Sequence, residues 1–128
     1  MSGSVSKFPG KKVLVVEDHY LNQELIIGIL QLMECEVTIA ANGDEGVRFA
    51  LEGDFHLILM DIMMPVKDGY EATREIRATQ RKRIPIIALT ACAMPGDRER
   101  CLEAGMDAYL AKPLDFESLE ALLNKYLN

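Results

Sequence analysis

Five side chains that could bind a metal ion or a phosphate group stand at the ends of apolar runs in the 128-residue sequence. Glu17 and Asp18 follow the first run, and Asp61 follows the run "LILM". Thr90 follows "IIAL", and Lys112 lies two residues beyond "AYL". Any one of them could merely be a polar residue that ends a strand. Acids, a hydroxyl and an ammonium at four strand ends together favour a functional site.

The apolar runs predict the strands that would position these side chains. Residues 13–16, 57–60 and 86–89 are apolar without alternation, which is typical of parallel strands buried on both faces. Weaker runs at residues 36–40 and 108–110 complete a series of five.

Helical spacing separates these runs. The apolar positions that indicate it are Leu21, Leu25, Ile29 and Leu32; Val47, Ala50 and Leu51; Ala72 and Ile76, with Glu75 opposite; and Phe116, Leu119, Leu122, Leu123 and Tyr126. Asn42 is a candidate N-cap, Pro95 a candidate first-turn residue, and Gly53 and Gly105 candidate left-handed helix ends. Five alternating β/α units predict an α/β domain with a parallel sheet, helices on both faces and right-handed crossovers.

In such a sheet, ligands bind beyond the carboxyl ends of the strands. If the first and third strands are neighbours, Glu17, Asp18 and Asp61 converge, and each ionised pair at about 4 Å repels by roughly 4 kcal/mol. Either one carboxyl keeps its proton or a divalent cation occupies the site. Oxygen ligands favour Mg²⁺, which Mn²⁺ could replace, and Lys112 would add positive charge.

A carboxylate at such a site can accept a phosphoryl group. Asp61 would attack, Glu17 and Asp18 would hold metal, and Thr90 and Lys112 would bind the product oxygens. A haloacid-dehalogenase-type phosphatase would need a second aspartate where Met63 stands. A flavodoxin-like cofactor carrier would need a Ser/Thr/Gly-rich loop after the first strand, and nucleotide or nucleophile-elbow motifs are absent from the sequence.

Composition limits the other classes. The length fits one domain, and the net charge of −6 argues against direct nucleic-acid binding, with the basic residues 77–83 expected to form a solvated loop. Three dispersed cysteines indicate free thiols in a reducing cytoplasm, and no apolar run reaches membrane-spanning length, so we expect no membrane contact. Residues 1–10 are expected to be a disordered N-terminal tail or a cloning remnant, and residues 11–128 the domain.

The motifs "VLVVEDHYLNQEL", "LILMDIMMPVKDGYEATREIR", "IIALTA" and "GMDAYLAKPL" together resemble the receiver domain of two-component response regulators over residues 11–128. The resemblance implies a flavodoxin-like, doubly wound (βα)5 fold with strand order 2-1-3-4-5. "EDHYLNQEL" resembles the receivers of hybrid sensor histidine kinases, so the chain could be a single-domain regulator or a piece of such a kinase, and the sequence leans to the second.

Residue roles follow from the resemblance by position. The resemblance implies that Asp61 is the phosphoacceptor and that Lys112 binds the phosphate. The implied metal ligands are Glu17, Asp18, Asp61 and the main-chain oxygen of Met63. Thr90 and Tyr109 are the implied switch residues. Tyr109 could equally be a core residue. The family usually has a cis bond at Lys112-Pro113. Met63 and Cys92 stand where side chains tune phosphoryl lifetime, and their apolar character predicts slow hydrolysis.

The implied function is transfer of a phosphoryl group from the phosphohistidine of a histidine kinase or histidine phosphotransfer domain to Asp61. The protein would catalyse only its own phosphorylation and dephosphorylation, and phosphorylation would change the surface formed by the fourth and fifth strands and their helices. The sequence leaves the oligomeric state open between a monomer and a weak dimer. The face with Thr90, Tyr109 and the last helix is the expected docking surface. The alternative is a pseudo-receiver, an interaction module that is not phosphorylated. His19 and His56 could be metal or relay residues, although an exposed loop histidine and a strand-entry histidine are the plainer interpretations.

Overall fold

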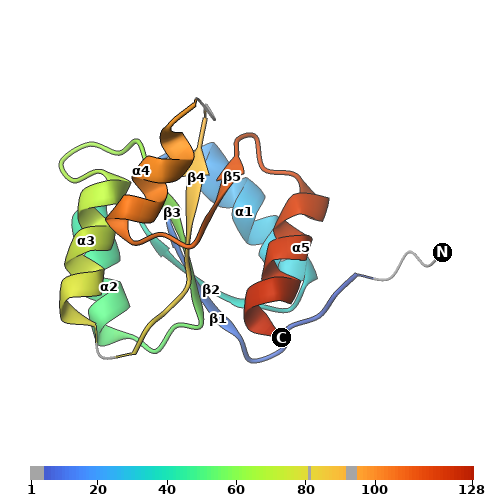
Figure 1. Cartoon of the computed structure of the whole chain (residues 1–128). Helices are drawn as coiled ribbons and strands as arrows, with labels where there is room; N and C mark the ends of the chain where they lie inside the picture. The colour runs from blue at the N-terminus through green and yellow to red at the C-terminus, as the bar shows by residue number, and fades with distance from the viewer. Residues whose placement is uncertain (1–4, 81, 92–94) are drawn as a thin grey trace.

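The computed structural model describes residues 5–80, 82–91 and 95–128. Ten elements alternate along the chain: β1 (Lys12–Val16), α1 (Tyr20–Leu32), β2 (Glu36–Ala40), α2 (Gly43–Glu52), β3 (Leu57–Asp61), α3 (Gly69–Thr79), β4 (Ile86–Thr90), α4 (Asp97–Ala104), β5 (Ala108–Ala111) and α5 (Phe116–Leu127). The strands form one parallel sheet in the order β2-β1-β3-β4-β5. Helices α1 and α5 cover one face and α2, α3 and α4 the other (Figure 1). The predicted fold class and strand order are confirmed. No helix within the described ranges combines the length and apolar character needed to cross a membrane.

The central strands are apolar throughout because both of their faces are covered. In β1, Val13 and Val15 pack in the core beneath α1 and α5, whereas Leu14 and Val16 pack in the core beneath α2, α3 and α4. The same alternation divides the side chains of β3 and β4 between the two cores. The edge strand β2 buries only Ala40 completely, which explains its weaker apolar pattern.

Side-chain caps begin three of the helices. Asn42 Oδ1 accepts a hydrogen bond from the Glu45 N–H (2.9 Å), as expected for an N-cap, and Asp68 and Asp115 cap α3 and α5 in the same way. Gly105 ends α4 with φ +106°, as predicted. Gly53 has φ −95° and is not left-handed, and Pro95 lies before Gly96, the N-cap of α4, so both of these predictions were wrong.

Helix α1 packs through a different face from the one that the leucine spacing predicted. Leu21, Leu25 and Leu32 are 70%, 44% and 59% exposed, and the side chains that reach the core are Ile26, Ile29, Leu30 and Met33. The helix has apolar residues around most of its circumference, so periodicity could not determine which stripe docks on the sheet. In the structure the stripe that contains Ile26, Ile29 and Leu30 packs on the sheet, and a second apolar stripe faces outward.

The other predicted helix faces agree better with the structure. Ala72 and Ile76 of α3 are buried while Glu75 is exposed. Leu119 and Leu123 of α5 are buried, with the other predicted apolar residues of that helix packed against the same core. In α2, Ala50 is buried but Leu51 is exposed at the helix end.

The segment before β1 contributes to the fold. Phe8 is 3% exposed in the core beneath α1 and α5, and its N–H donates to the Met33 carbonyl (2.8 Å). The N–H of Ser6 donates to Glu120 Oε2 (2.8 Å). The expectation that residues 1–10 lie outside the fold therefore fails for Phe8, because its ring is buried in the core that α1 and α5 cover. Residues 1–4 lie outside the described residues.

The basic residues 77–83 are not simply a solvated loop. Arg77 is the last basic residue of α3, and its guanidinium donates to the carbonyls of Gly105 (2.8 Å) and Ile84 (2.7 Å) and to Asp107 Oδ2 (2.9 Å). Arg83 pairs with the other oxygen of Asp107 at 2.7 Å. These bonds tie α3 to the segments that enter β4 and β5.

Candidate functional site

The register of the sheet brings the predicted site residues to one place. Val16 of β1 pairs with Met60 of β3, so Glu17 and Asp61 leave adjacent strands side by side. Thr90 pairs with Ala111, one residue before Lys112, on the other side of β3. The carboxyl ends of four parallel strands thus meet at one edge, as the sequence indicated.

Three carboxylates form the centre of this site. One ligand oxygen from each of Glu17, Asp18 and Asp61 lies within 4.8 Å of the others. Glu17 and Asp61 are buried and Asp18 is exposed. The cluster therefore has a rigid inner side, supplied by two strand ends, and an outer side open to solvent.

Lys112 neutralises part of this charge. Its Nζ lies 2.9 Å from Glu17 Oε1 and 3.1 Å from Asp61 Oδ2, bridging the two buried acids. The Lys112-Pro113 peptide bond that follows is cis, the isomer that the resemblance implied.

Backbone amides hold the two buried carboxylates in place. Glu17 Oε2 accepts from the N–H of His19 (2.9 Å), and Asp61 Oδ1 accepts from the N–H of Met63 (3.2 Å). The side-chain amide of Gln23 donates to the main-chain oxygen of Glu17 (2.7 Å), a contact that the sequence did not reveal. Glu17 Oε1 is buried, and the Lys112 ammonium lies 2.9 Å from it.

The two buried acids differ in their pKa values. Burial raises the pKa of Asp61 from an ordinary 3.8 to about 6, and the charge of Glu17 adds to the rise, while Lys112 and the Met63 N–H oppose it. Burial alone would also raise the pKa of Glu17, but the His19 N–H and the Lys112 ammonium outweigh burial, so this pKa is lowered. The pair behaves as one coupled system in which Glu17 keeps the negative charge and Asp61 holds a proton more readily.

This donor set fits a hard divalent cation such as Mg²⁺. The three carboxylates supply only oxygen ligands, these oxygens lie within 4.8 Å of one another, and the exposed side of Asp18 leaves room for water ligands. An added positive charge would favour ionised Asp61, whose proton is otherwise stabilised by burial and by Glu17. The described residues contain no second cluster of three His, Cys, Asp or Glu side chains suited to a metal ion.

The remaining predicted residues surround this centre. Thr90 is buried at the end of β4 and Met63 is 75% exposed, and both line a hollow of about 300 Å³ beside the acids. Tyr109 lies on β5 with its side chain partly exposed, away from the acid cluster and next to Lys125 and Leu102 in a separate hollow. Cys92 lies outside the described residues.

The histidines and the two described cysteines form no cluster of three possible metal ligands within the described part of the chain. His19 is exposed at the N-cap of α1, and His56 Nδ1 accepts from the Lys12 N–H (3.0 Å), so both plainer interpretations agree with the structure. Cys35 and Cys101 are free and buried, and burial raises the pKa of Cys35 to about 11. Neither thiol is suited to nucleophilic chemistry.

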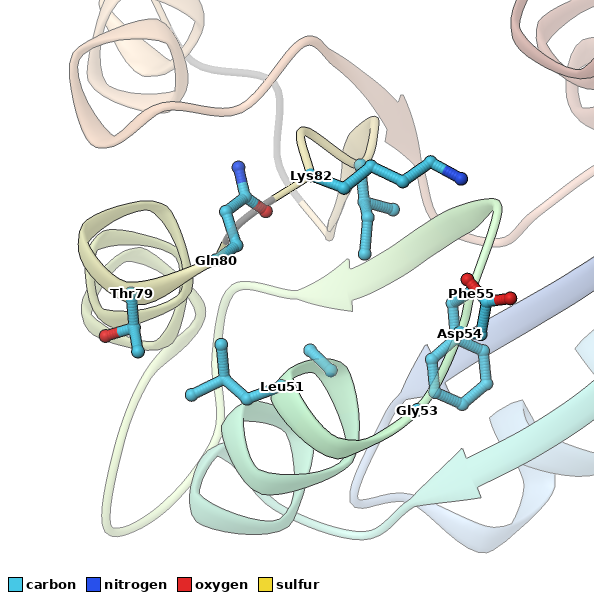
Figure 2. Close-up of a pocket in the computed structure, with 9 residues that line it drawn as sticks. Leu51, Gly53, Asp54, Phe55, Thr79, Gln80 and Lys82 are labelled. Atoms are coloured by element: carbon cyan, nitrogen blue, oxygen red, sulfur yellow. The ribbon is translucent and has the colours of Figure 1, made fainter.

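A larger hollow, of about 410 Å³, lies at the opposite end of the strands. Figure 2 shows it between the ends of α2 and α3, with Gly53, Asp54 and Phe55 on one side and Thr79, Gln80 and Lys82 on the other. These residues precede β3 and β4, so this hollow is remote from Asp61. The charged residues among its described lining are Asp54 and Lys82, so this lining offers no cluster of acids like the one around Asp61.

Comparison with known proteins agrees with this geometry. Residues 13–124 match the model of the response regulator receiver domain family. The chain is 43% identical over 119 residues to hybrid signal transduction histidine kinase G of Dictyostelium discoideum, covering 90% of this chain and 4% of that protein. It is 42% identical over 115 residues to the histidine-protein kinase BarA of Escherichia coli, covering 89% of this chain and 12% of that one. The chain therefore corresponds to a small part of these curated relatives.

Solved structures include two informative neighbours. One is the receiver domain of sensor histidine kinase PA1611 from Pseudomonas aeruginosa, crystallised with a magnesium ion coordinated in its active-site cleft; it is 48% identical, with a TM-score of 0.85 and coverage of 92% of this chain and 98% of that one. The other is the Saccharomyces cerevisiae receiver domain of Ssk1 in co-crystals with the histidine phosphotransfer protein Ypd1, at 32% identity and a TM-score of 0.87, covering 94% and 90%. The family match, the sheet order and the acid cluster lead to one conclusion: the chain belongs to the response regulator receiver domain family.

Proposed function

We propose that this receiver domain accepts a phosphoryl group on Asp61 from a phosphohistidine, in a relay that includes a histidine kinase or a histidine phosphotransfer domain. The observation that carries the proposal is the convergence of Glu17, Asp18 and Asp61 within 4.8 Å, with Lys112 bridging the two buried acids. A pseudo-receiver, which would bind partners without being phosphorylated, has no need for this complete set.

The chemical step is a displacement at phosphorus. One carboxylate oxygen of Asp61 forms a bond to phosphorus, the bond between phosphorus and the imidazole nitrogen breaks, and the imidazole leaves with the electron pair. In this proposal the Lys112 ammonium, now 3.1 Å from Asp61 Oδ2, would pair with the oxygens of the incoming group, and the Thr90 hydroxyl would donate a hydrogen bond to one of them.

Mg²⁺ is the expected cofactor, and Mn²⁺ could replace it. Glu17, Asp18, Asp61 and the main-chain oxygen of Met63 would hold the ion, which when bound would neutralise charge on the phosphoryl oxygens. The N–H of Met63 already donates to Asp61, so the Met63 backbone lies next to the carboxylate, as this ligand set requires.

The switch that we propose involves Thr90 and Tyr109. Movement of the Thr90 hydroxyl toward a bound phosphoryl group would favour a second packing of the Tyr109 ring and so change the surface of α4, β5 and α5. The partial exposure of Tyr109 supports a ring that can occupy more than one position. The slow hydrolysis inferred from Met63 and Cys92 belongs to the same proposal, and a phospho-Asp61 half-life of only seconds in purified protein would contradict it.

The outward stripe of α1 is the surface that we propose for the phosphodonor. Leu25 lines a small hollow with Lys112, so the stripe of Leu21, Leu25 and Leu32 runs directly from the acceptor site along the helix. A donor protein must bring its histidine to Asp61, and an apolar surface that begins there would hold it in place. The α4-β5-α5 face then remains free to bind the output partner.

We further propose that the chain is part of a hybrid histidine kinase and acts in the cytoplasm. The identities of 42–43% to hybrid and BarA-type kinases support the first point, and the phosphohistidine donors of such relays support the second.

The test is phosphorylation by a small donor. Purified protein incubated with acetyl phosphate and Mg²⁺ should gain one phosphoryl group by intact mass, and the gain should disappear with EDTA or in Asp61→Asn. A wild-type protein that gains none under these conditions would favour the pseudo-receiver alternative. A gain that persists in Asp61→Asn would place the phosphoryl group elsewhere and contradict the proposal.

A further inference from the structure

The loop between β3 and α3 has an unfavourable turn at its tip. The N–H of Lys67 donates to the carbonyl of Pro65 (2.8 Å), and the residue between them, Val66, has φ +73°. A three-residue turn of this hand is rare and strained, and a β-branched residue is poorly suited to it. The Val66 side chain is 85% exposed, so packing of that side chain does not hold the turn.

Ion pairs made by Lys67 hold it instead. Lys67 Nζ lies 3.0 Å from Asp44 Oδ1 at the start of α2 and also contacts the Glu75 carboxylate in α3. The Lys67 side chain is only 19% exposed although it stands at the end of a loop. Both acids raise the pKa of Lys67, Glu75 first, so the ammonium stays charged. One side chain therefore ties the loop to two different helices.

The loop backbone is also in close contact with α2. An added Cβ at Gly43, in the first turn of α2, would collide with the main-chain oxygen and the Cβ of Lys67. The loop is thus fixed at its tip by two ion pairs and by direct backbone contact.

The same loop carries the groups that orient Asp61. At its base, the N–H of Gly69 donates to the Ile62 carbonyl (2.9 Å), and Met63 donates its N–H to Asp61 Oδ1 (3.2 Å). Only Met64 and the turn itself separate Met63 from Lys67, so a displaced tip would shift the Met63 backbone relative to the carboxylate.

We propose that Lys67 is a positioning residue: its ion pairs with Asp44 and Glu75 hold the β3–α3 loop so that the Met63 backbone faces Asp61, and they thereby set the affinity of the acid cluster for Mg²⁺. This inference rests on the proposed function, because it concerns the same site. Lys67 does not itself contact Asp61 among the contacts described, and its role is exerted through the loop.

The test compares Lys67→Met, which keeps the length and removes the charge, with Lys67→Arg, which keeps both ion pairs available. Lys7→Met is a matched control, because Lys7 also pairs with an acid (Glu34, 3.5 Å) but at the opposite end of the sheet. Two quantities are measured without any phosphoryl donor: residue-specific amide hydrogen exchange in the absence of metal, and the dissociation constant for Mg²⁺ by calorimetry.

In Lys67→Met we expect exchange of the Met63, Lys67 and Gly69 amides to accelerate, and Mg²⁺ affinity to fall, each by about three- to tenfold, the range that two partly exposed ion pairs can supply. Amides of β1 and α5 should be unchanged. Lys67→Arg should restore both quantities to within about twofold of wild type, and Lys7→Met should change neither.

Unchanged loop exchange and unchanged Mg²⁺ affinity in Lys67→Met would overturn the inference. Acceleration spread evenly over β1 and α5 would also overturn it, because it would indicate a general loss of stability. A failure of acetyl phosphate to label Asp61 would count against the proposed function alone, since neither measurement uses a donor. A wild-type protein that does not bind Mg²⁺ would overturn both, whatever the exchange data show.

Discussion

At the scale of residues, the two buried acids of the site differ in how readily each one ionises, and this difference exists without any bound ligand. Glu17 is stabilised as a carboxylate by the His19 N–H and by Lys112, whereas burial and the charge of Glu17 raise the pKa of Asp61 to about 6. The residue that we propose as the nucleophile is therefore the one of the two whose ionised form is less stable. The ionised form of Asp61 is destabilised by burial and by Glu17, so a cation that binds beside this carboxylate is stabilised by its negative charge.

The raised pKa of Asp61 predicts a pH-dependent loss of stability in metal-free protein. Between pH about 4 and 6 the folded state binds a proton that the unfolded state has released, so the free energy of unfolding falls as pH rises through this window. Above it the cost is on the order of 2–3 kcal/mol. Asp61→Asn removes this cost, so we expect it to be more stable than wild type at pH 7.5 in EDTA, with the difference vanishing near pH 4. Urea unfolding across this range measures it, and parallel pH profiles for the two proteins would contradict it.

Most of these residues could be predicted individually. Glu17, Asp18, Asp61, Thr90 and Lys112 each end a recognisable apolar run, so their shared position follows once the strands are parallel. Gln23 and Lys67 had no such signal. Gln23 contacts the main-chain oxygen of Glu17, and Lys67 pairs with Asp44 and Glu75. Neither contact belongs to an apolar pattern in the sequence.

At the scale of elements, helix α1 shows how a strong pattern can mislead. It has two apolar stripes, and the one made of leucines faces outward beside the acceptor site. An exposed stripe of this kind has no role in the core, which is why we assign it to the phosphodonor.

A substitution in this stripe should slow phosphoryl transfer from a protein donor without slowing transfer from a small-molecule donor. We expect Leu25→Ser to reduce transfer from a phosphorylated histidine phosphotransfer protein by about tenfold or more, as for a central interface residue, and to leave acetyl phosphate labelling nearly unchanged. Leu25 is already 44% exposed, so little stability should be lost. Leu51→Ser, at 39% exposure on α2, is the matched control and should affect neither reaction. Equal loss with both donors would indicate damage to the site and contradict a docking role.

The junction of β3 with α3 offers a second prediction. A Cβ at Gly69 would collide with the main-chain oxygen of Asp61 and the Cα of Ile62, so room for it requires a shift of the backbone that carries the Asp61 carboxylate. Gly69→Ala should therefore lower the free energy of unfolding by about 1–3 kcal/mol and weaken Mg²⁺ binding.

Gly28→Ala is the corresponding control. Gly28 lies in α1 with nothing within 4 Å of an added Cβ, so alanine there should stabilise the helix by about 0.5–1 kcal/mol. Denaturant unfolding of both variants measures the contrast, and similar effects of the two substitutions would contradict the close packing of Gly69 on Asp61.

At the scale of the whole molecule, the chain between Val5 and β1 links the two helices on one face of the sheet. Phe8 fills the core beneath α1 and α5, Lys7 Nζ donates to the Leu32 carbonyl (3.1 Å), and Ser6 bonds to Glu120 in α5. Figure 1 shows this segment passing the C-terminal end of α5 before it enters β1. Any domain that preceded this one in a longer protein would be connected through a segment that is itself packed on α5.

Loss of the Phe8 ring should therefore destabilise the whole domain. We expect Phe8→Ala to lower the free energy of unfolding by about 3 kcal/mol or more, the usual cost of removing a buried aromatic ring. Pro9→Ala, at the exposed neighbouring position, should change it by less than about 1 kcal/mol. Urea unfolding midpoints compare the two, and equal effects would mean that the segment does not pack as described.

The sequence by itself determined the class of the fold and the chemistry of its site. Unbroken apolar runs require coverage on both faces, their alternation with helices requires parallel strands, and parallel strands place their carboxyl ends at one edge. Those three steps are enough to bring Asp61 to the same edge as Glu17 and Lys112, because each step depends on local pattern and chain connectivity alone.

Only the tertiary structure decided which helix faces, loops and terminal residues pack against the rest of the domain. Four features depend on contacts between elements that lie far apart in the chain. They are the packed face of α1, the burial of Phe8, the ion pairs of Lys67 and the hydrogen bonds of the Arg77 guanidinium. Such contacts form when the layers pack, and their energies arise from the fit of complete surfaces. A pattern read along one segment contains no information about the surface that the segment will meet.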